Sequence, residues 1–226
     1  MTLLGLIVLS NTVAAQKDSS SISAPDHDRG RAWIVPGALI ASAAIDPEIR
    51  EWALQTHARS LDHLAHLINP LGTARVLVPG MAAFYMGSVV ARDASAEHAA
   101  LEMAAAYTAS DVVESILKPV IGRERPHAAG NARRFHPLTS DGDWHSLPSA
   151  HVAHITAIAS AVAMETHSRV ISSVFDVLVA LVGWDRIYED QHWTSDVTAT
   201  AALTALVSST TVRWVRSRWS ADSGNH

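Results

Sequence analysis

The sequence predicts an all-α fold, a single compact helical bundle that takes up most of the 226 residues. Apolar residues recur at helical spacing along most of the chain, and no alternating run of β-branched residues indicates a strand. Hydrophobic residues make up 48% of the chain but charged residues only 17%, against about 25% charged in an average soluble domain. Much of the chain is therefore expected to be buried, and its length fits one sizeable core rather than two.

The N-terminal residues have the pattern of an export signal. Residues 2–9 are apolar and a small-residue cleavage pattern follows at residues 13–15, although the basic residues that usually precede the apolar part are missing. The apolar part is much shorter than the roughly 20 residues that span a bilayer. We predict a signal peptide over residues 1–15, a polar segment over residues 16–31 and a periplasmic location. A frayed first helix of a cytosolic domain is the alternative.

The first helices are predicted from apolar periodicity and from residues that start or stop a helix. Residues 32–45 are apolar and rich in small side chains. Asp46 can cap the next helix, with Pro47 at its first position and an acidic first turn. Apolar residues then recur at helical spacing until Asn69 and Pro70 stop the helix.

A second long apolar helix is predicted over residues 71–91, interrupted at Pro79 and Gly80. Residues 76–91 are also the best candidate for a membrane span, but this stretch is short for the hydrocarbon core of a bilayer. The mean hydropathy of the chain is only mildly positive, whereas a chain with many spans would be more hydrophobic. We therefore favour a soluble domain over a membrane-spanning one, with peripheral membrane contact as an alternative.

Residues 95–98 resemble the N-terminal cap of an alanine-rich helix that runs to about Leu117. Residues 122–147 form the one long irregular stretch, rich in glycine and in charged residues. Loops of that length in a compact domain are usually functional. The remaining helices are predicted over residues 149–166, 168–188 and 192–218.

Charge and residue usage argue against several classes of function. The net charge is −5 and no basic block is present, so we expect no nucleic-acid partner. The absence of cysteine excludes disulfides, thiolate catalysis and zinc–sulfur sites. The 13 histidines indicate imidazole chemistry. His63 and His66 are three residues apart but lack a partner carboxylate motif, so we expect no metal site there.

The densest cluster of charged residues lies between Gly183 and Val197, directly after an apolar run. His192 and Asp196 are four residues apart and share one face of a helix. A carboxylate in that position can hold one imidazole nitrogen and leave the other free and basic. Arg186 lies six residues before His192, close enough to bring a planar cation to the same pocket.

A second stretch places Lys118 seven residues before Arg125, with Pro126 directly after it. Gly122 is expected to end the helix, so that Arg125 returns to Lys118 from the loop. Two converging cations with few acids around them indicate an oxyanion ligand. Taken alone, a solvated run of charge is the simpler explanation.

A third stretch lies at the end of the long loop, where Ser149 would be the N-cap of an apolar helix. The first N–H groups of that helix, beginning with Ala150, can bind phosphate through hydrogen bonds and the helix dipole. His151 lies in the first turn and faces the same spot. An ordinary capped helix with a surface histidine is the alternative, and His145 and His154 are expected to be structural.

In chain order, the three motifs are Lys-x6-Arg-Pro, Pro-Ser-x-His and Arg-x5-His-x3-Asp. This combination resembles the type 2 phosphatidic acid phosphatase (PAP2) superfamily. That superfamily includes bacterial acid phosphatases, lipid phosphate phosphatases and vanadium haloperoxidases. The resemblance implies a bundle of the acid phosphatase/haloperoxidase type over residues 32–219, followed by a polar tail over residues 220–226. Two positions differ. The family usually has glycine where Ala150 stands, and often a small residue where Asp185 stands, whose carboxylate must turn away from phosphate or pair with Arg186.

The resemblance also implies the roles of these residues. His192 would be the nucleophile that forms a phosphohistidine, Asp196 would fix its tautomer, and His151 would protonate the leaving oxygen and then activate water. No metal is expected, because cationic side chains would take the role that Mg²⁺ has in other phosphoryl transfers. The phosphate-binding residues would be Lys118, Arg125, Ser149, Ala150 and Arg186.

The predicted function is therefore an exported, metal-independent phosphatase that hydrolyses small organic or lipid phosphomonoesters. The first alternative is a membrane-associated phosphatase of lipid phosphates or polyprenyl diphosphates. The others are a haloperoxidase that binds vanadate as its cofactor, and an oxyanion binder without catalysis. The short chain favours a phosphatase, since haloperoxidases of this superfamily tend to be larger.

Overall fold

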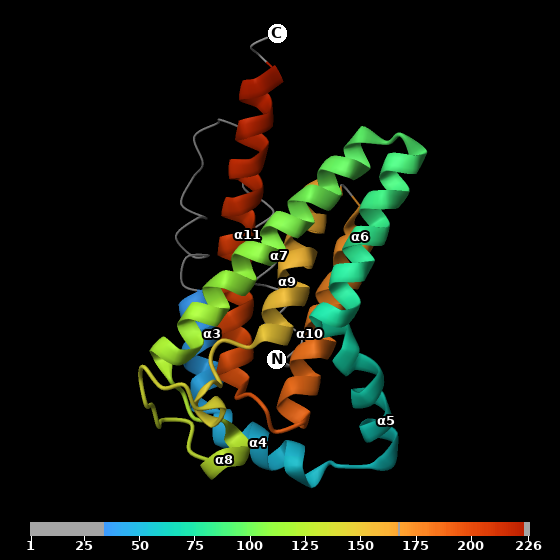
Figure 1. The fold of residues 1–226 in the computed structure, drawn as a ribbon. Coiled ribbons are helices and arrows are strands. Elements are labelled where there is room, and N and C mark those ends of the chain that lie inside the picture. The colour runs from blue at the N-terminus through green and yellow to red at the C-terminus, as the bar shows by residue number, and fades with distance from the viewer. Residues whose placement is uncertain (1–33, 167, 224–226) are drawn as a thin grey trace, which may run out of the picture.

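The computed structural model describes residues 34–166 and 168–223, and within these ranges it contains helices and turns but no strand (Figure 1). The prediction of an all-α fold is confirmed. The predicted signal peptide and polar segment, residues 1–31, lie outside the described residues. The α-helices are α3 (Ile34–Ala44), α4 (Asp46–Gln55), α5 (Arg59–Ile68), α6 (Ala74–Ala91), α7 (Ala94–Ile121), α8 (Pro126–Ala129), α9 (Ala150–Glu165), α10 (Arg169–Tyr188) and α11 (Thr194–Ser223), and the 3-10 turns are η1 (Asn69–Gly72) and η2 (Gly142–Trp144).

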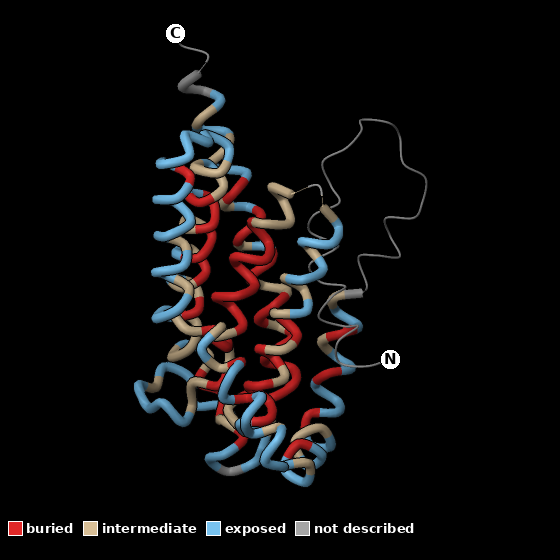
Figure 2. Tube along the Cα trace, turned by 90° about the vertical axis from the view of Figure 1, so that its right-hand side faces the viewer, coloured by how far each residue is buried: buried red, intermediate tan, exposed pale blue. Residues whose placement is uncertain are grey.

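Helix α9 is the centre of the bundle. Helices α7, α10 and α11 pack around it, and residues 152–161 are all buried (Figures 1 and 2). A helix buried on every side needs mostly small or apolar side chains, and alanine, isoleucine, valine, serine and threonine make up most of this one. One apolar cluster joins α9 to α10, and a second joins it to α7. These two clusters pack the four helices against one another.

The first predicted helix after residue 45 is in fact two helices. Helix α4 ends at Gln55 and α5 begins at Arg59, so the prediction of one helix up to Asn69 is wrong. At the break the backbone contacts a residue distant in the sequence: the Ala58 N–H donates a hydrogen bond to the Tyr188 hydroxyl on α10 at 3.3 Å. Asp46 is also no cap, since its carboxylate turns inward and is buried.

The later helices are longer than predicted. Helix α6 continues through Pro79 without interruption, and α7 begins at Ala94 after an Asp93 cap. Helix α11 extends to Ser223, into the predicted polar tail. Gly122 ends α7 as predicted, in a left-handed conformation (φ +58°) where a Cβ would lie 1.9 Å from a backbone oxygen. Glycine is therefore required at this turn.

The outer surface of the bundle is unusually apolar. Helix α6 has 18 residues with a mean hydropathy of 1.4, long and apolar enough to cross a membrane, and only 6% of them are buried. At about 1.5 Å per residue it is about 27 Å long, close to the roughly 30 Å of a hydrocarbon core. Large apolar side chains are also exposed on other helices of the bundle: Leu101, Ile116, Val174, Leu206 and Trp214.

Candidate active site

The three predicted motifs meet at one end of the bundle because each lies at a helix end. Helices α7 and α10 end there, and α9 and α11 begin there (Figure 1). The first motif closes α7 and enters the following loop, the second opens α9, and the third spans the turn between α10 and α11. Residues far apart in the sequence are thereby brought to one place.

His192 is buried in the turn between α10 and α11, with 5% of its surface exposed. Its Nδ1 donates a hydrogen bond to the Ser146 carbonyl at 2.5 Å. Because that carbonyl only accepts, Nδ1 carries the proton and Nε2 keeps its lone pair. Ser146 therefore sets the tautomer that a nucleophilic Nε2 requires.

Asp196 does not hold His192 as expected. Its Oδ2 lies 4.0 Å from Nδ1 of the imidazole, too far for a hydrogen bond. The carboxylate instead accepts from the Ser146 hydroxyl at 2.5 Å, the Trp193 N–H at 2.9 Å and the Arg123 guanidinium at 2.5 Å. The expectation of a direct hydrogen bond is corrected: Ser146 bonds to Asp196 through its hydroxyl and to His192 through its carbonyl.

A buried ion network that the motifs did not predict supports Asp196. The Arg123 guanidinium pairs with Asp196 and, at 2.9 Å, with Asp46 from α4. Asp46 in turn accepts from the backbone and hydroxyl of Ser195. Nearly every polar atom of the network has a partner, which makes two buried carboxylates tolerable.

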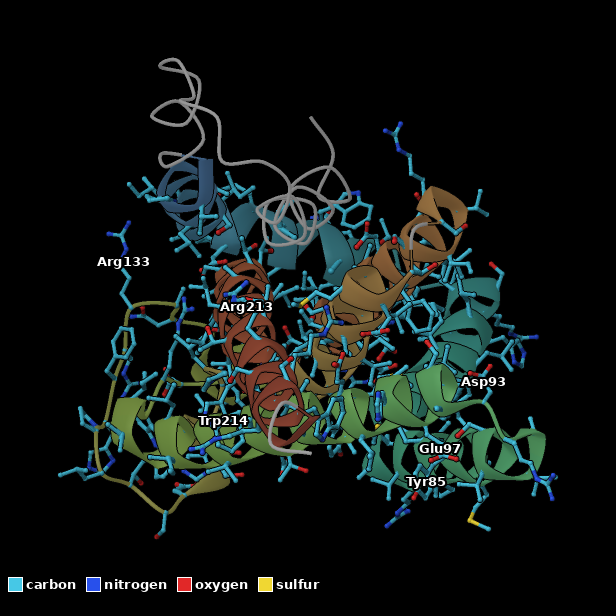
Figure 3. The ribbon with its side chains drawn as sticks, turned by 90° about the horizontal axis from the view of Figure 1, so that it is seen from above. Tyr85, Asp93, Glu97, Arg133, Arg213 and Trp214 are labelled. Carbon is cyan, nitrogen blue, oxygen red and sulfur yellow. The ribbon has the colours of Figure 1, made fainter. Side chains whose placement is uncertain are left out.

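We expect Arg123→Met to lower the free energy of unfolding by about 3–5 kcal/mol, because it leaves two buried carboxylates without their cation. Denaturant unfolding of the purified protein measures the change. Arg133→Met is the matched control, since Arg133 lies in the same loop but is exposed and points away from the bundle (Figure 3). Equal stability of the two variants would contradict the role assigned to Arg123.

His151 lies in the first turn of α9 and its Nε2 is 3.2 Å from Oδ1 of Asn69. Burial lowers the pKa of His151 to about 4, with further lowering by Arg186, His154, Lys118 and Arg125. The imidazole is therefore neutral near neutral pH.

The pKa of His192 is also lowered well below its usual value, first by burial and then by Arg125, Lys118 and Arg186, while its hydrogen bond to Ser146 opposes the shift. The same three cations thus act on both imidazoles. The sequence analysis predicted that the two histidines and the three cations lie together, and their mutual effects on pKa agree with that prediction.

Each of the three cations has a fixed position. Lys118 Nζ pairs with Glu114, one helical turn earlier, at 2.9 Å. Arg125 donates from Nε to the Gly142 carbonyl at 3.0 Å and from Nη1 to the Gln191 side chain at 2.9 Å. Neither acceptor of Arg125 is charged, so its positive charge remains available to an anionic ligand.

Arg186 pairs with Asp185, and both side chains are buried. This is one of the two arrangements that the sequence allowed for an aspartate beside the phosphate site. The pairing holds the Asp185 carboxylate on the guanidinium, but it also neutralises part of the charge that Arg186 offers to a ligand.

The N-terminus of α9 is the remaining part of the site. Ser149 is the N-cap, as predicted, yet its side chain makes no capping hydrogen bond. Among the described residues its hydroxyl is buried without a hydrogen-bond partner, while its backbone N–H donates to Thr200 at 2.9 Å. An unpaired buried hydroxyl is costly, and beside the N–H of Ala150 it is available to an oxyanion.

One group of side chains has the composition of a metal site. Ligand atoms of Asp111, Glu114 and His154 lie within 4.8 Å of one another. Glu114 already pairs with Lys118, and both imidazole nitrogens of His154 have oxygen partners. Each of Glu114 and His154 therefore already has a partner from the protein itself.

The chain belongs to the PAP2 superfamily, whose profile matches residues 99–220. No curated protein sequence matches the chain. A transmembrane PAP2-type phosphatidylglycerolphosphate phosphatase from Bacillus subtilis is similar in structure, with a TM-score of 0.62 and 20% identity over 96% of this chain and 98% of the other. LpxE from Aquifex aeolicus has a TM-score of 0.57 and 20% identity over 74% and 94%. The family predicted from three motifs is confirmed, and both structures share the fold.

Proposed function

We propose that the protein is a membrane-associated phosphatase that hydrolyses lipid phosphomonoesters through a phosphohistidine on His192. The observation that carries the proposal is the imidazole of His192, whose Nδ1–H is held by the Ser146 carbonyl while Nε2 remains unprotonated among three cations. Phosphoryl transfer needs an unprotonated nucleophile and positive charge around the equatorial oxygens of the phosphoryl group.

The reaction has two steps. Nε2 of His192 attacks phosphorus, the N–P bond forms, and the P–O ester bond breaks as protonated His151 gives its proton to the leaving oxygen. In the second step neutral His151 takes a proton from water, whose oxygen attacks phosphorus while the N–P bond breaks. Lys118, Arg125 and Arg186 stabilise the charge that spreads over the phosphoryl oxygens in both steps.

The apolar exterior supports a lipid substrate. A cavity of about 550 Å³ lies between α6, α7, α9 and α10, lined by apolar side chains that include Leu77, Phe84 and Phe175. It begins at the first turn of α6, directly after η1, which touches His151. An acyl chain in this cavity would lie along α6, beyond η1.

The exposed face of α6 supports membrane association in place of the soluble domain that composition favoured. The bundle would lie with its apolar belt in the hydrocarbon and with the site end, including the first turn of α9, at the membrane surface. A phosphate head group at the surface and an acyl chain along α6 then match the arrangement of a lipid in a bilayer.

The decisive comparison is between phosphatidic acid in mixed micelles and glycerol 3-phosphate, which presents the same phosphomonoester without acyl chains. We expect kcat/KM for the lipid to exceed that for glycerol phosphate by about 10²-fold or more, since each buried methylene contributes about 0.8 kcal/mol. Equal values would indicate a general acid phosphatase, and phosphate binding without turnover would indicate a non-catalytic binder.

Two glycines of α6 provide a matched pair of positions at which the role of the cavity can be tested. A Cβ on either Gly80 or Gly87 meets open space, but only Gly80 lines the cavity. Gly80→Leu should lower kcat/KM for phosphatidic acid by about 10-fold by filling the space, and should leave glycerol phosphate turnover unchanged. Gly87→Leu should alter neither. A loss with both substrates, or with neither, would place the acyl chain elsewhere.

We expect activity to survive dialysis against EDTA, because three side-chain cations neutralise the transferring phosphoryl group. The measurement is phosphate release before and after dialysis, with and without added Mg²⁺. A loss that Mg²⁺ restores would contradict the metal-independent mechanism and would direct attention to Asp111, Glu114 and His154.

A further inference from the structure

The 3-10 turn η1 between α5 and α6 lies directly against His151. Oδ1 of Asn69, the first residue of the turn, is 3.2 Å from Nε2 of the imidazole. Gly72, the last residue of the turn, is buried, and a Cβ there would lie 2.7 Å from Cβ of His151 and 2.9 Å from its ring. The turn therefore contacts the imidazole both through a hydrogen bond and through its backbone.

The turn is anchored by a second histidine, one helical turn further along α9. Nδ1 of His154 is 3.2 Å from the Gly72 carbonyl, and its Nε2 is 2.8 Å from the Asp111 carboxylate on α7. Each ring nitrogen of His154 thus faces one oxygen partner, one from η1 and one from α7. The Tyr107 ring packs against His154, with 4.6 Å between the two ring centroids. Helix α7 thereby holds η1 in place through His154.

The contact with Asn69 determines which nitrogen of His151 can exchange a proton. An amide oxygen only accepts, so Nε2 carries a proton in both charge states of the ring. The proton that is gained and lost is then on Nδ1. We propose that Asn69 is a positioning residue that makes Nδ1 of His151 the acid–base atom of the reaction, and that η1 fixes the plane of the ring. This inference rests on the proposed function.

The use of an amide rather than a carboxylate has a chemical consequence. An aspartate in this position would orient the ring equally well but would add a negative charge, which raises the pKa of an adjacent imidazole. The amide orients the ring and leaves it under the influence of the cations. His151 is then a stronger acid than it would be beside a carboxylate, which favours proton transfer to a poor leaving group.

The test uses two soluble substrates whose leaving groups differ. An alkyl phosphate needs a proton on its leaving oxygen, whereas p-nitrophenyl phosphate releases a stable phenolate without one. We expect Asn69→Ala to lower kcat/KM by about 10²-fold for the alkyl phosphate and much less for p-nitrophenyl phosphate. Gln55→Ala, which removes an exposed amide whose hydrogen bond goes to the neighbouring Glu51, should change neither value. Equal losses with both substrates would show a merely structural role and overturn the proposal.

Asn69→Asp is the conservative variant. It should restore most of the alkyl phosphate activity and move the alkaline limb of the kcat/KM profile to higher pH, because the carboxylate raises the pKa of His151. An unshifted profile would contradict the assignment. A readout without catalysis is the ¹⁵N NMR spectrum of histidine-labelled protein, where we expect the Nε2–H tautomer for His151. The Nδ1–H tautomer would overturn the proposal whatever the activity, whereas failure of the wild-type protein to hydrolyse phosphatidic acid as well as both soluble substrates would count against the proposed function.

Discussion

We expect His192→Ala to lower kcat by about 10⁴-fold or more, since loss of a nucleophile removes the covalent step on which the other groups act. The substitution removes a buried ring, so folding has to be verified by comparing the thermal unfolding of the variant and the wild type. His63→Ala is the matched control, because His63 is exposed on α5, and its activity should stay normal. Turnover by His192→Ala within 10-fold of the wild type would refute the assignment of the nucleophile.

The second large effect concerns His151, whose pKa of about 4 results from burial and from neighbouring cations. His151→Ala should lower kcat by about 10²–10⁴-fold. With p-nitrophenyl phosphate, phosphoenzyme should accumulate, because phenolate leaves without the acid but water still needs the base. A burst of nitrophenolate followed by a slow phase would be the kinetic sign, and a variant without a burst would contradict the dual role.

The same pKa predicts the pH dependence of the wild type. The acid must be protonated, so kcat/KM, which reflects the free enzyme, should fall as pH rises above about 4. A bound phosphate dianion offsets the cations that lower this pKa, so the alkaline limb of kcat should lie at higher pH than that of kcat/KM. Protonation of the nucleophile His192 limits the acidic limb instead, and the lowered pKa of His192 moves that limb to lower pH. Coincident alkaline limbs would contradict this electrostatic account.

Much of the site was predictable because its residues lie in short motifs at helix ends. Ser149 and His151 open α9, and Lys118 precedes the glycine that ends α7. Residues that cap or break a helix act on the adjacent helix end, so the sequence predicted these termini well. The convergence of the motifs followed from the resemblance to the family.

The contacts that set the tautomers were not predictable. Ser146 acts on His192 through a backbone carbonyl, which no side-chain pattern reveals, and Asn69 meets His151 across 82 residues. In the sequence Asn69 was visible only as a residue that stops a helix. The buried partner of Asp196 was missed for a related reason, since Arg123 looked like part of a solvated run of charge.

The expectation of a soluble domain took no account of how the helices pack. Mean hydropathy averages over the chain, whereas the apolar residues of α6 are concentrated on a surface that the rest of the protein leaves exposed. The break between α4 and α5 was missed similarly, because it depends on Tyr188 from a distant helix. Periodicity predicts that a helix forms, but which face it buries depends on its neighbours.

The most direct measurement is the identification of the covalent intermediate. Protein mixed with ³²P-labelled phosphatidic acid and quenched in alkali within milliseconds should carry label that is stable in base and lost in acid, and peptide mapping should place it on His192, with the phosphorus on Nε2. Label on another residue, or no label during rapid turnover, would contradict the account.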